Sequence, residues 1–587
     1  MSIKQLQYFL KNYNIKHVFG YSGGANLPIL NNIKKSKHTT FIANRNEQCA
    51  GHAATGYSNF DGIGVTITTS GPGVTNMITP LHDAYSDGIP LIAITGQVPT
   101  SSIGTDAFQE CNAIELTKPC VKWNYQLNKY DNIYDVLKYA YEISISPRKG
   151  PVHIDIPKDI GMSEIIPNNS CELYDQMEYK TIEKDDTSYI NYDNLLDLIM
   201  TAKKPVIIAG KGCIDNSSRK LLQKISMTLN IPIATTLHGL GVVDETEYYS
   251  LGMVGMHGSV TANYAVQNSD LIIGLGYRYD DRTTGNVDKY ALDAKKIHID
   301  NSEKQIKLVQ NTLKNHDLIS IQKDTNNVLE ELVNIFDKFD ENVIYNSFQK
   351  RTYWSEQIDI WKYYNPYMYH DDINRLPKIQ YVLQKLDNYL ECNDCHKSVL
   401  FTTGVGNHQM MTAQYITWKY PSLLTSGSLG VMGVGLPYAI GAQLANPDKQ
   451  VIVIDGDGSF NMTHVDLMTV KEQNLPIKIF IMNDCRLQMV HTWQKLFFNE
   501  NYIATEHENP DYSMLAEAHG IKSFVCDKRE DVTKTIKSSL IYPGACVVEF
   551  KVDPDICLPL VPPGNTIDDM MLFGDNQIIE NQSLPPS

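Results

Sequence analysis

The stretch Val451-Ile-Val-Ile-Asp-Gly-Asp-Gly-Ser459 decides the fold. Its four leading apolar residues predict a buried strand, and its glycine-rich remainder is typical of a turn from a strand into a helix. A second apolar run, 477–482, ends at Asn483-Asp484. Asp457 and Asp484 are 27 positions apart (484 − 457), which leaves room for a helix between two strands. Both aspartates are therefore expected at the same edge of a parallel sheet.

This edge is predicted to bind phosphate and a cation, because ligands of open α/β sheets bind beyond the carboxyl ends of the strands. Gly456 and Gly458 let backbone N–H groups approach a phosphate, and the following helix adds its dipole. Asp457 and Asp484 supply hard oxygen ligands, so that phosphate oxygens, a backbone carbonyl and water would complete a magnesium site. The alternative interpretation is a helix cap at Asp457 and a simple turn at Asn483-Asp484.

The chain has 587 residues, too many for one hydrophobic core. Short apolar runs alternate with helical periodicity in three blocks, which predicts an α/β fold with three doubly wound parallel-sheet domains. The predicted domains cover residues 1–165, 190–340 and 375–560, followed by a tail at 561–587. Two stretches, 164–189 and 336–376, are interpreted as linkers because one is polar and the other is irregular.

The first and third blocks have the same spacing of glycines and strands. Gly51-His-Ala-Ala-Thr-Gly56 precedes a turn at Gly71 by 20 residues (71 − 51), and Gly435-Leu-Pro-Tyr-Ala-Ile-Gly441 precedes the turn at Gly456 by 21 (456 − 435). We therefore expect the first and third domains to be related and the middle one to be different.

The formal net charge of −16 argues against binding to nucleic acid or to a membrane surface. The apolar stretch 423–445 is interrupted by glycines and Pro437, which favours a buried helix over a membrane span. No targeting segment is recognised, and eleven scattered cysteines fit a reducing compartment, so a cytoplasmic location is predicted. Cys392-Asn-Asp-Cys-His396 has the spacing of covalent haem attachment, but without an export signal we interpret it as a surface loop.

The pair of aspartate motifs resembles the signature G-D-G followed after about 25 residues by N-N in thiamine-diphosphate enzymes. Four further segments are similar to acetolactate (acetohydroxyacid) synthases, and the resemblance covers roughly residues 5–575. They are Val18-Phe-Gly-Tyr-Ser-Gly-Gly-Ala25, Thr69-Ser-Gly-Pro-Gly73, Gly96-Gln-Val-Pro-Thr100 and Ile103-Gly-Thr-Asp-Ala-Phe-Gln-Glu110. The chain departs from the family at Asp484, where Asn is usual, and at Ser22, where Pro is usual.

The resemblance implies a thiamine-diphosphate site with Mg²⁺. Asp457, Asp484 and the backbone carbonyl of Arg486 would hold the metal. Met432 would be the apolar wedge that keeps the cofactor bent, with the Gly430 carbonyl and the Met432 N–H on the aminopyrimidine. The implied contacts of this cofactor are Gly24, Glu47, Gly430, Met432, Gly456, Asp457, Gly458, Ser459, Asp484 and Met489.

Glu47 precedes the small-residue helix, where a carboxylate ordinarily interacts with the helix dipole. In the resembled family the matching glutamate hydrogen-bonds N1′ of the aminopyrimidine and favours the tautomer that removes the C2 proton. Such a carboxyl group should be buried, where its pKa rises. The resemblance places this glutamate and the diphosphate site on different subunits, so a homodimer is the minimum active unit and a homotetramer is an alternative.

The segments Leu251-Gly-Met-Val-Gly-Met-His-Gly258 and Gly276-Tyr-Arg-Tyr-Asp-Asp-Arg282 resemble those of FAD-binding acetolactate synthases. Taken alone they are ordinary glycine-rich loops. The resemblance implies a flavin with a structural role, because acetolactate formation is redox-neutral. The implied FAD contacts are Thr236, Leu237, Met256, His257, Gly276, Arg278, Asp280, Arg282, Asp300 and Asp324.

The resemblance also implies a substrate site, formed by Phe108, Gln109, Lys158, Met489 and Trp493. Trp493 matches the position that selects the second 2-ketoacid and would favour 2-ketobutyrate, although an aromatic core residue is the alternative. Arg486 stands where an acidic residue is usual, which bears on the same choice. The predicted catalytic residues are Glu47, Gln109, Met432 and Trp493.

The resemblance implies a transferase that decarboxylates pyruvate on thiamine diphosphate and transfers the hydroxyethyl unit to pyruvate or 2-ketobutyrate. This reaction is the first step of branched-chain amino-acid biosynthesis. The alternatives are another thiamine-diphosphate-dependent 2-ketoacid decarboxylase or oxidase, and a non-catalytic cofactor-binding homologue. Glyoxylate carboligase is disfavoured because it lacks the glutamate present here as Glu47. A separate regulatory subunit is left open.

Overall fold

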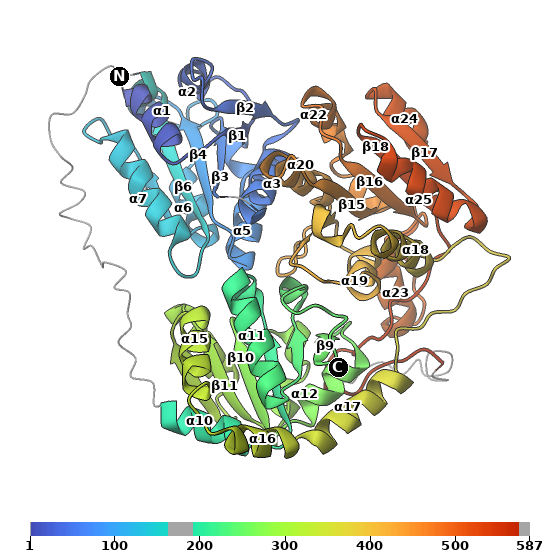
Figure 1. Cartoon of the computed structure of the whole chain (residues 1–587). Coiled ribbons are helices and arrows are strands. Elements are labelled where there is room, and N and C mark those ends of the chain that lie inside the picture. The colour runs from blue at the N-terminus through green and yellow to red at the C-terminus, as the bar shows by residue number, and fades with distance from the viewer. Residues whose placement is uncertain (1, 61, 163–191, 575–587) are drawn as a thin grey trace.

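Three parallel six-stranded sheets organise the chain, as the sequence predicts (Figure 1). The computed structural model describes residues 2–60, 62–162 and 192–574. The predicted linker at 164–189 lies outside these residues, and so does the part of the predicted C-terminal tail after residue 574. Helices cover the faces of each sheet, which confirms the α/β class with three doubly wound domains. The exact domain boundaries remain predictions.

The first domain contains a sheet of order β2-β1-β3-β4-β6-β5. The strands are β1 His17–Gly20, β2 Thr40–Ala43, β3 Gly64–Thr68, β4 Leu91–Gln97, β5 Trp123–Gln126 and β6 Pro151–Pro157. The helices are α1 Ser2–Asn12, α2 Leu27–Ile33, α3 Glu47–Phe60, α4 Pro72–Thr75, α5 Ile78–Asp87, α6 Ala113–Thr117, α7 Ile133–Ile145 and α8 Lys158–Met162. Strands β3, β4 and β6 are buried along their whole length because helices cover both faces.

The third domain repeats this strand order as β14-β13-β15-β16-β18-β17. Its strands are β13 Val399–Thr403, β14 Leu423–Leu424, β15 Gln450–Gly456, β16 Lys478–Asn483, β17 Lys522–Cys526 and β18 Cys546–Lys551. Its helices are α18 Ile379–Cys392, α19 Asn407–Tyr415, α20 Gly435–Ala445, α21 Asp457–Phe460, α22 Leu467–Glu472, α23 Gln488–Phe497, α24 Tyr512–Ala518 and α25 Val532–Ile541. The shared order agrees with the expectation that these two domains are related.

The middle domain has a different order, β12-β11-β10-β7-β8-β9. Its strands are β7 Pro205–Ala209, β8 Ile233–Thr235, β9 Ser250–Met253, β10 Leu271–Leu275, β11 Lys295–Asp300 and β12 Leu318–Gln322. Its helices are α10 Tyr192–Thr201, α11 Asn216–Leu229, α12 Val260–Gln267, α13 Asp281–Thr284, α14 Glu303–Thr312 and α15 Thr325–Phe336. The order reverses between β10 and β7, the kind of switch point where nucleotides bind in doubly wound sheets.

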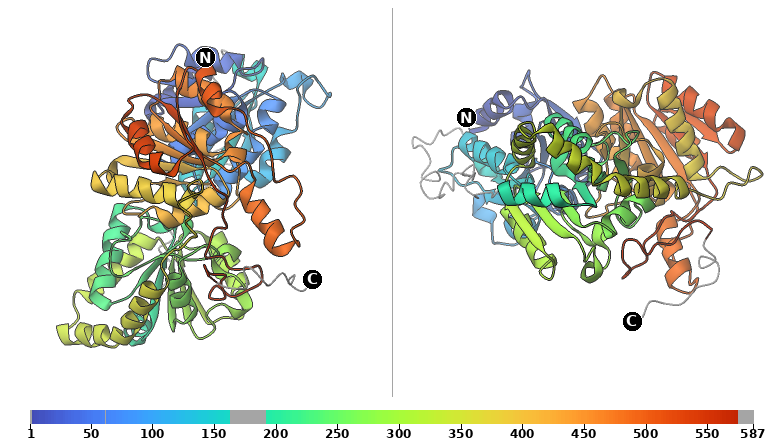
Figure 2. Two further views of the ribbon diagram at one scale, coloured as in Figure 1. Left: turned by 90° about the vertical axis from the view of Figure 1, so that its right-hand side faces the viewer. Right: turned by 60° about the horizontal axis from the view of Figure 1, so that its bottom comes forward.

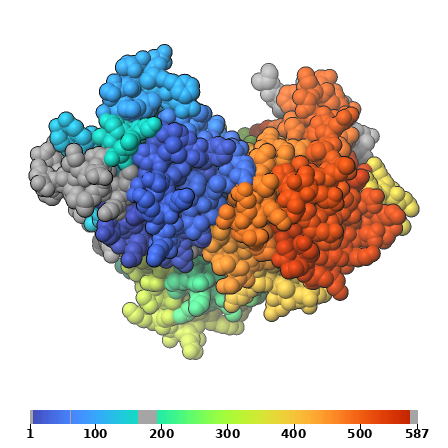
Figure 3. All heavy atoms as spheres, turned by 90° about the horizontal axis from the view of Figure 1, so that it is seen from above, coloured from blue at the N-terminus to red at the C-terminus, as the bar shows by residue number. Residues whose placement is uncertain are grey.

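The first and third domains lie side by side above the middle one (Figures 2 and 3). Helices α3 and α20 pack against each other, and a single hydrophobic core continues from Phe19 and Tyr57 in the first domain to Tyr438 and Ile479 in the third. Gly56 and Gly441, the last residues of the two similarly spaced glycine segments, lie where α3 and α20 approach each other closely. A side chain on Gly56 would collide with the Tyr438 carbonyl oxygen, and one on Gly441 with that of Ala53.

The region 336–376 is not the irregular linker that the sequence predicts throughout. It contains α16 Glu341–Gln349 and α17 Thr352–Tyr364, and α17 buries Trp354 and Ile358 against the middle domain. The segment at Cys392 is the end of α18, where buried His396 lies near Asp387 and Glu391. None of the described helices has the length and apolarity needed to cross a membrane.

Candidate active site

Strands β15 and β16 bring the two predicted metal ligands to one edge of the third sheet. Gly456 pairs in register with Met482, so the residues that follow each strand emerge next to one another. Asp457 is the first residue of α21, and its Oδ1 accepts a hydrogen bond of 2.9 Å from the Gly458 N–H. Asp457 therefore begins a helix, as the alternative interpretation proposes, and also lines a pocket together with Asp484.

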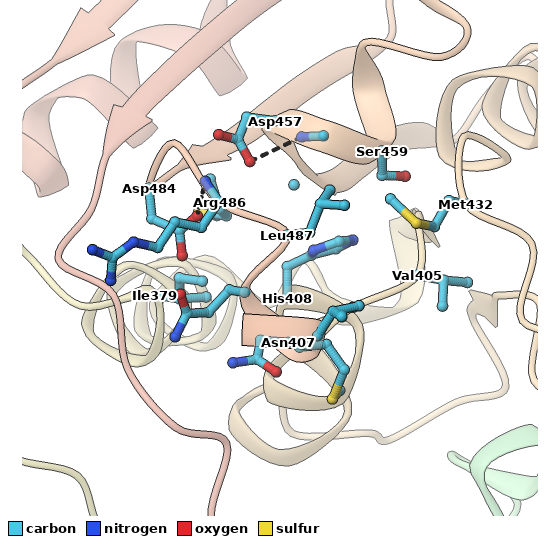
Figure 4. A pocket seen from close by; sticks show the side chains of 17 residues that line it. Ile379, Val405, Asn407, His408, Met432, Asp457, Ser459, Asp484, Arg486 and Leu487 are labelled. Atoms are coloured by element: carbon cyan, nitrogen blue, oxygen red, sulfur yellow. Dashed lines mark hydrogen bonds between the residues drawn. The ribbon is translucent and has the colours of Figure 1, made fainter. Parts of the chain in front are cut away.

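The pocket has about 430 Å³ of empty space, part of which is open to solvent. Asp457 and Asp484 lie on one side of it and Met432 and Ser459 on the other, with His408 between them (Figure 4). The other predicted residues along its wall are Gly456, Gly458, Arg486 and Met489. One pocket thus gathers most of the residues that the sequence predicts in the third domain.

The two aspartates lie in surroundings that disfavour their charged forms. Burial, with a further contribution from the nearby Asp457 carboxylate, raises the pKa of Asp484 to about 8, although the N–H and the charge of Arg486 oppose the shift. Burial also raises the pKa of Asp457, against hydrogen bonds from Asn509 and Gly458. A bound cation would remove this penalty because it supplies the missing positive charge.

Asp484 shows whether the residues of this pocket suit a metal ion. Its Oδ1 accepts a 3.1 Å hydrogen bond from the Arg486 N–H, whereas its buried Oδ2 has no hydrogen-bond partner. Among the described residues no cluster of three or more His, Cys, Asp or Glu side chains is arranged to hold a metal. Two carboxylates and a backbone carbonyl fit an ion that takes its other ligands from phosphate and water.

The loop 427–433 forms the wall opposite the aspartates and contains the predicted wedge, Met432. Gly430 has a φ of +72°, a conformation that L side chains rarely adopt, so the turn before Met432 requires glycine. The Gly433 N–H donates to Ser459 Oγ at 2.8 Å, which connects the end of this loop to the turn 456–459. Met432 is thereby fixed relative to Asp457.

Two residues at this site are not among those predicted from the sequence. His408 follows the glycine-containing turn after β13, lines the pocket, and places its Nε2 3.4 Å from Asp455 Oδ1. Asn509 donates to Asp457 Oδ2 at 2.7 Å and to Asn483 Oδ1 at 2.9 Å. The glycines at 404 and 406, directly after an apolar strand, are a signal that could have indicated His408; no comparable signal marks Asn509.

The residues predicted in the first domain do not line this pocket. Glu47 is 7% exposed at the start of α3 and accepts a 2.9 Å hydrogen bond from Asn76. Gly24 is exposed, and a side chain there would meet no atom within 4 Å. Phe108 is 88% exposed, Gln109 is also exposed, and Lys158 begins α8 after β6. Within one chain, Glu47 therefore does not line the same pocket as the turn 456–459.

The predicted acceptor residue Trp493 lies half-buried on α23 and packs its ring edge-on against Phe497, with 5.1 Å between the centroids. It is one turn from Met489, which does line the pocket. Arg486 has its guanidinium 3.1 Å from the Glu506 carboxylate. The charge of Arg486 thus has a partner within the chain.

The middle domain carries its predicted flavin residues at the carboxyl edge of its sheet. Gly276 follows β10, Asp300 ends β11 and Asp324 follows β12, while Thr236 and Leu237 follow β8. Asp324 is exposed and caps α15 through the N–H groups of Asn326 and Asn327.

Other predicted flavin residues pair with each other. Arg278 lies 2.8 Å from Asp280, and Arg282 lies 3.2 Å from the Met256 sulfur. His257 is buried beside the Pro559 carbonyl.

Three cations gather near the switch point, where a dinucleotide phosphate would bind. Lys211 follows β7 and lies close to Arg148 and Arg278. Burial lowers the pKa of Lys211 to about 8; Asp87 opposes the shift, and the neighbouring cations add to it. No ion-pair partner is found for Arg148 or Lys211 in the described part of the chain. Neither residue is among the predicted contacts, although Lys211 lies between Gly210 and Gly212 directly after β7.

Three family models match consecutive parts of the chain. They are the thiamine pyrophosphate enzyme N-terminal TPP binding domain over residues 3–116, the central domain over 192–332 and the C-terminal TPP binding domain over 404–550. The matches follow the three sheets in order.

Curated relatives are similar along nearly the whole chain. The acetolactate synthase catalytic subunit, mitochondrial, of Saccharomyces cerevisiae is 40% identical over 96% of this chain and 82% of its own length. The acetolactate synthase, mitochondrial, of Schizosaccharomyces pombe is 42% identical over 95% of this chain and 84% of its own. The probable acetolactate synthase large subunit of Methanococcus aeolicus is 36% identical over 97% and 96%.

Proposed function

This chain belongs to the acetolactate synthase family of thiamine pyrophosphate enzymes, and on that premise we propose that it joins two 2-ketoacids. The donor is pyruvate, which loses its carboxyl group, and the acceptor is a second pyruvate or 2-ketobutyrate. Either product is a 2-acetohydroxy acid, the chemistry that begins branched-chain amino-acid biosynthesis. The observation that supports this proposal most is the pocket shared by Asp457, Asp484 and Met432.

Thiamine pyrophosphate, when bound, supplies the electron sink that decarboxylation of a 2-ketoacid needs. In our proposal Asp457, Asp484 and the Arg486 carbonyl hold Mg²⁺ against the diphosphate. Gly456, Gly458 and Ser459 add backbone and hydroxyl donors at the start of α21. Met432 and Met489 exclude water from the apolar part of the cofactor. The buried oxygen of Asp484 that lacks a partner supports the metal proposal.

Glu47 is proposed to hold a proton at the aminopyrimidine of a second subunit. Its burial supports this role, since a carboxyl group that shares a proton with a ring nitrogen needs a site of low polarity. Because Glu47 does not line the pocket of its own chain, we propose a homodimer at least. Gly24, Phe108, Gln109 and Lys158 would then face the Met432 loop of the partner subunit. Phe108, which is 88% exposed in one chain, is a residue that the second chain would cover in this proposal.

The flavin is proposed to be FAD, bound at the switch point of the middle sheet with a structural role. Arg148, Lys211 and Arg278 would neutralise its diphosphate, while Asp300 would accept a ribose hydroxyl. The proximity of these three cations supports a bound anion there. Because the overall reaction neither oxidises nor reduces its substrates, the flavin has no redox task in it.

A cytoplasmic location and a separate regulatory subunit remain predictions. The relatives named above include catalytic and large subunits, and two of them are named mitochondrial.

The test is to incubate the purified chain with pyruvate, thiamine pyrophosphate and Mg²⁺, with and without 2-ketobutyrate, and to identify the products. We expect acetolactate, and acetohydroxybutyrate when both ketoacids are present. Release of acetaldehyde alone would identify a simple decarboxylase, and reduction of an added electron acceptor would identify an oxidase. Omission of thiamine pyrophosphate should abolish all products.

A further inference from the structure

Helix α5 ends where the three domains meet, and two of its carboxylates are buried there (Figure 1). Asp83 and Asp87 are one turn apart and so lie on the same side of the helix. Asp83 accepts hydrogen bonds from Ser426 Oγ at 2.5 Å and from the Tyr438 hydroxyl. All the partners of Asp83 found here lie in the first or third domain; the nearby ring of His52 belongs to the first.

Asp87 binds the beginning of the loop that contains Met432. The Gly427 N–H donates to Asp87 Oδ2 at 3.2 Å, and the Ser428 hydroxyl donates to Asp87 Oδ1. Further along, the Val431 N–H donates to Ser426 Oγ at 3.0 Å. The loop 427–433 is thus attached at its start to α5, and at its end to Ser459 in the turn 456–459.

The same aspartate also contacts the middle domain. His238 Nε2 lies 3.1 Å from Asp87 Oδ1, and Lys211 Nζ donates to the Asp87 backbone carbonyl at 3.0 Å. One residue earlier, Arg278 donates to the Ser86 carbonyl at 3.1 Å. Burial opposes ionisation of Asp87, but His238, Lys211 and the Ser428 hydroxyl hold its pKa below the ordinary value.

These contacts connect the two cofactor regions through the end of α5, where the Asp87 carboxylate meets His238 on one side and Gly427 and Ser428 on the other. His238 directly follows Thr236 and Leu237, and Arg278 is itself a proposed flavin contact. Toward the third domain, Asp87 binds Gly427 and Ser428, the first residues of the loop 427–433, which contains Met432. We propose that Asp87 is a positioning residue that couples the two sites, so that flavin bound to the middle domain strengthens the retention of thiamine pyrophosphate. This inference rests on the flavin site of the proposed function.

The physical basis is the cost of ordering the 427–433 loop. A flavin that contacts Arg278 and the backbone beside His238 restrains the groups that hold Asp87. The loop then loses less conformational freedom when thiamine pyrophosphate binds, which makes the second binding tighter. Linkage is reciprocal, so thiamine pyrophosphate should strengthen flavin binding by the same factor.

The experiment measures the dissociation constant of thiamine pyrophosphate by isothermal titration calorimetry at fixed Mg²⁺, without substrate. Flavin-loaded and flavin-depleted full-length protein are compared, and flavin content is read from absorbance. In the parent chain the flavin-loaded form should bind more tightly, by about 5–150-fold, the usual range for coupled sites. In Asp87→Asn this ratio should approach one.

Asp83→Asn is the matched control, because Asp83 binds Ser426 at the base of the same loop and, within the described residues, its hydrogen bonds and its ion pair all lie in the first and third domains. It should weaken thiamine pyrophosphate binding in both forms and keep the parent ratio. His238→Ala provides a second test that leaves the bonds from Gly427 and Ser428 to Asp87 in place. It should lower the ratio toward one even if Asp87→Asn does not fold.

The proposal is overturned if the parent chain binds thiamine pyrophosphate equally well in both forms or binds no flavin. It is also overturned if His238→Ala keeps the parent ratio, or if Asp83→Asn loses the coupling as completely as Asp87→Asn. Acetolactate formation by the parent chain is assayed separately. A failed coupling with acetolactate still formed leaves the proposed carboligase function intact.

Discussion

The first and third domains have the same strand order but differ in the two connections that matter for chemistry. After β15 the chain turns through Gly456, Asp457 and Gly458 into α21. After β3 the corresponding turn leads through Gly71 to Pro72, which lacks an N–H group and an acidic neighbour. Only the third domain therefore places an acidic metal ligand at this point, and the first domain offers one backbone donor fewer. The fold is shared, but the site depends on a few turn residues.

The second difference is the connection from the edge strand, β14 or β2, to the helix at the contact between the two domains, α20 or α3. In the third domain the connection 425–434 joins β14 to α20 and is long enough to carry Met432 to the pocket. In the first domain the connection 44–46 is short, so Glu47 stands directly at the start of α3. In the proposed function, the third domain therefore binds the diphosphate and carries Met432, and the first domain supplies Glu47.

Glu47→Gln tests this division most severely. We expect cofactor binding to stay nearly intact while deprotonation of the cofactor C2 slows by about 10²–10⁴, the usual effect of removing a positioned proton-transfer group. Hydrogen–deuterium exchange at C2, followed by NMR, measures this step. Glu115→Gln, an exposed carboxylate on α6, is the control. If the rate of hydrogen–deuterium exchange is unchanged in Glu47→Gln, Glu47 is not the residue that assists deprotonation of the cofactor.

Asp457→Ala tests the task of the third domain. Loss of this carboxylate removes a ligand of the proposed Mg²⁺ ion and should abolish Mg²⁺-dependent retention of thiamine pyrophosphate. Without the ion, nothing offsets the repulsion between the diphosphate and Asp484. Asp484→Asn keeps an oxygen ligand and should be tolerated. Titration of the cofactor at several Mg²⁺ concentrations distinguishes the two variants. Parental Mg²⁺ dependence in Asp457→Ala would mean that the metal lies elsewhere.

The sequence predicts the sheets well because a buried parallel strand is a continuous apolar run, as at β7 and β15. It predicts the turn from strand to helix at 456–459 because the residues involved are consecutive. It misses α17, whose buried residues Trp354 and Ile358 lie among exposed tyrosines that hide the helical pattern. Only the fold could show that this stretch packs against the middle sheet.

Long-range contacts explain the site residues that sequence reasoning does not reach. Asn509 meets Asp457 across 52 residues, and Asp87 meets Gly427 across 340. Neither pair has a local pattern, because each depends on how distant elements pack. Conversely, the sequence groups Glu47 with the other catalytic residues, whereas the geometry of one chain separates it from Asp457.

Trp493→Leu tests whether the third domain also selects the acceptor. If Trp493 packs against the ethyl group of 2-ketobutyrate, the variant should lose preference for it over pyruvate. A methylene in an apolar pocket contributes about 1–3 kcal/mol, or roughly 10–200-fold in discrimination. The ratio of acetohydroxybutyrate to acetolactate, with both ketoacids competing, measures the effect. Phe498→Leu, near the exposed end of the same helix, should leave it unchanged. An unaltered ratio in Trp493→Leu would remove Trp493 as the selector.

Gly441→Ala tests the contact that joins the two related domains. In a helix, alanine is ordinarily more stable than glycine by about 0.5–1 kcal/mol. At Gly441, however, the added methyl group would collide with the Ala53 carbonyl, and overpacking of this kind costs about 1–3 kcal/mol. We therefore expect a lower midpoint of thermal unfolding by calorimetry. Gly161→Ala in α8 is the control, because a side chain there meets only ordinary contacts at 3.7 and 3.8 Å.

Gly56→Ala should have a similar effect, since its methyl group would strike the Tyr438 carbonyl from the other side of the same contact. If α3 and α20 separate slightly in either single variant, the second substitution meets less resistance. The double variant should then lower the midpoint by less than the sum of the two single shifts. Strict additivity would contradict this, because it would mean that the two glycines relieve independent collisions and that the helix pair does not move as one interface.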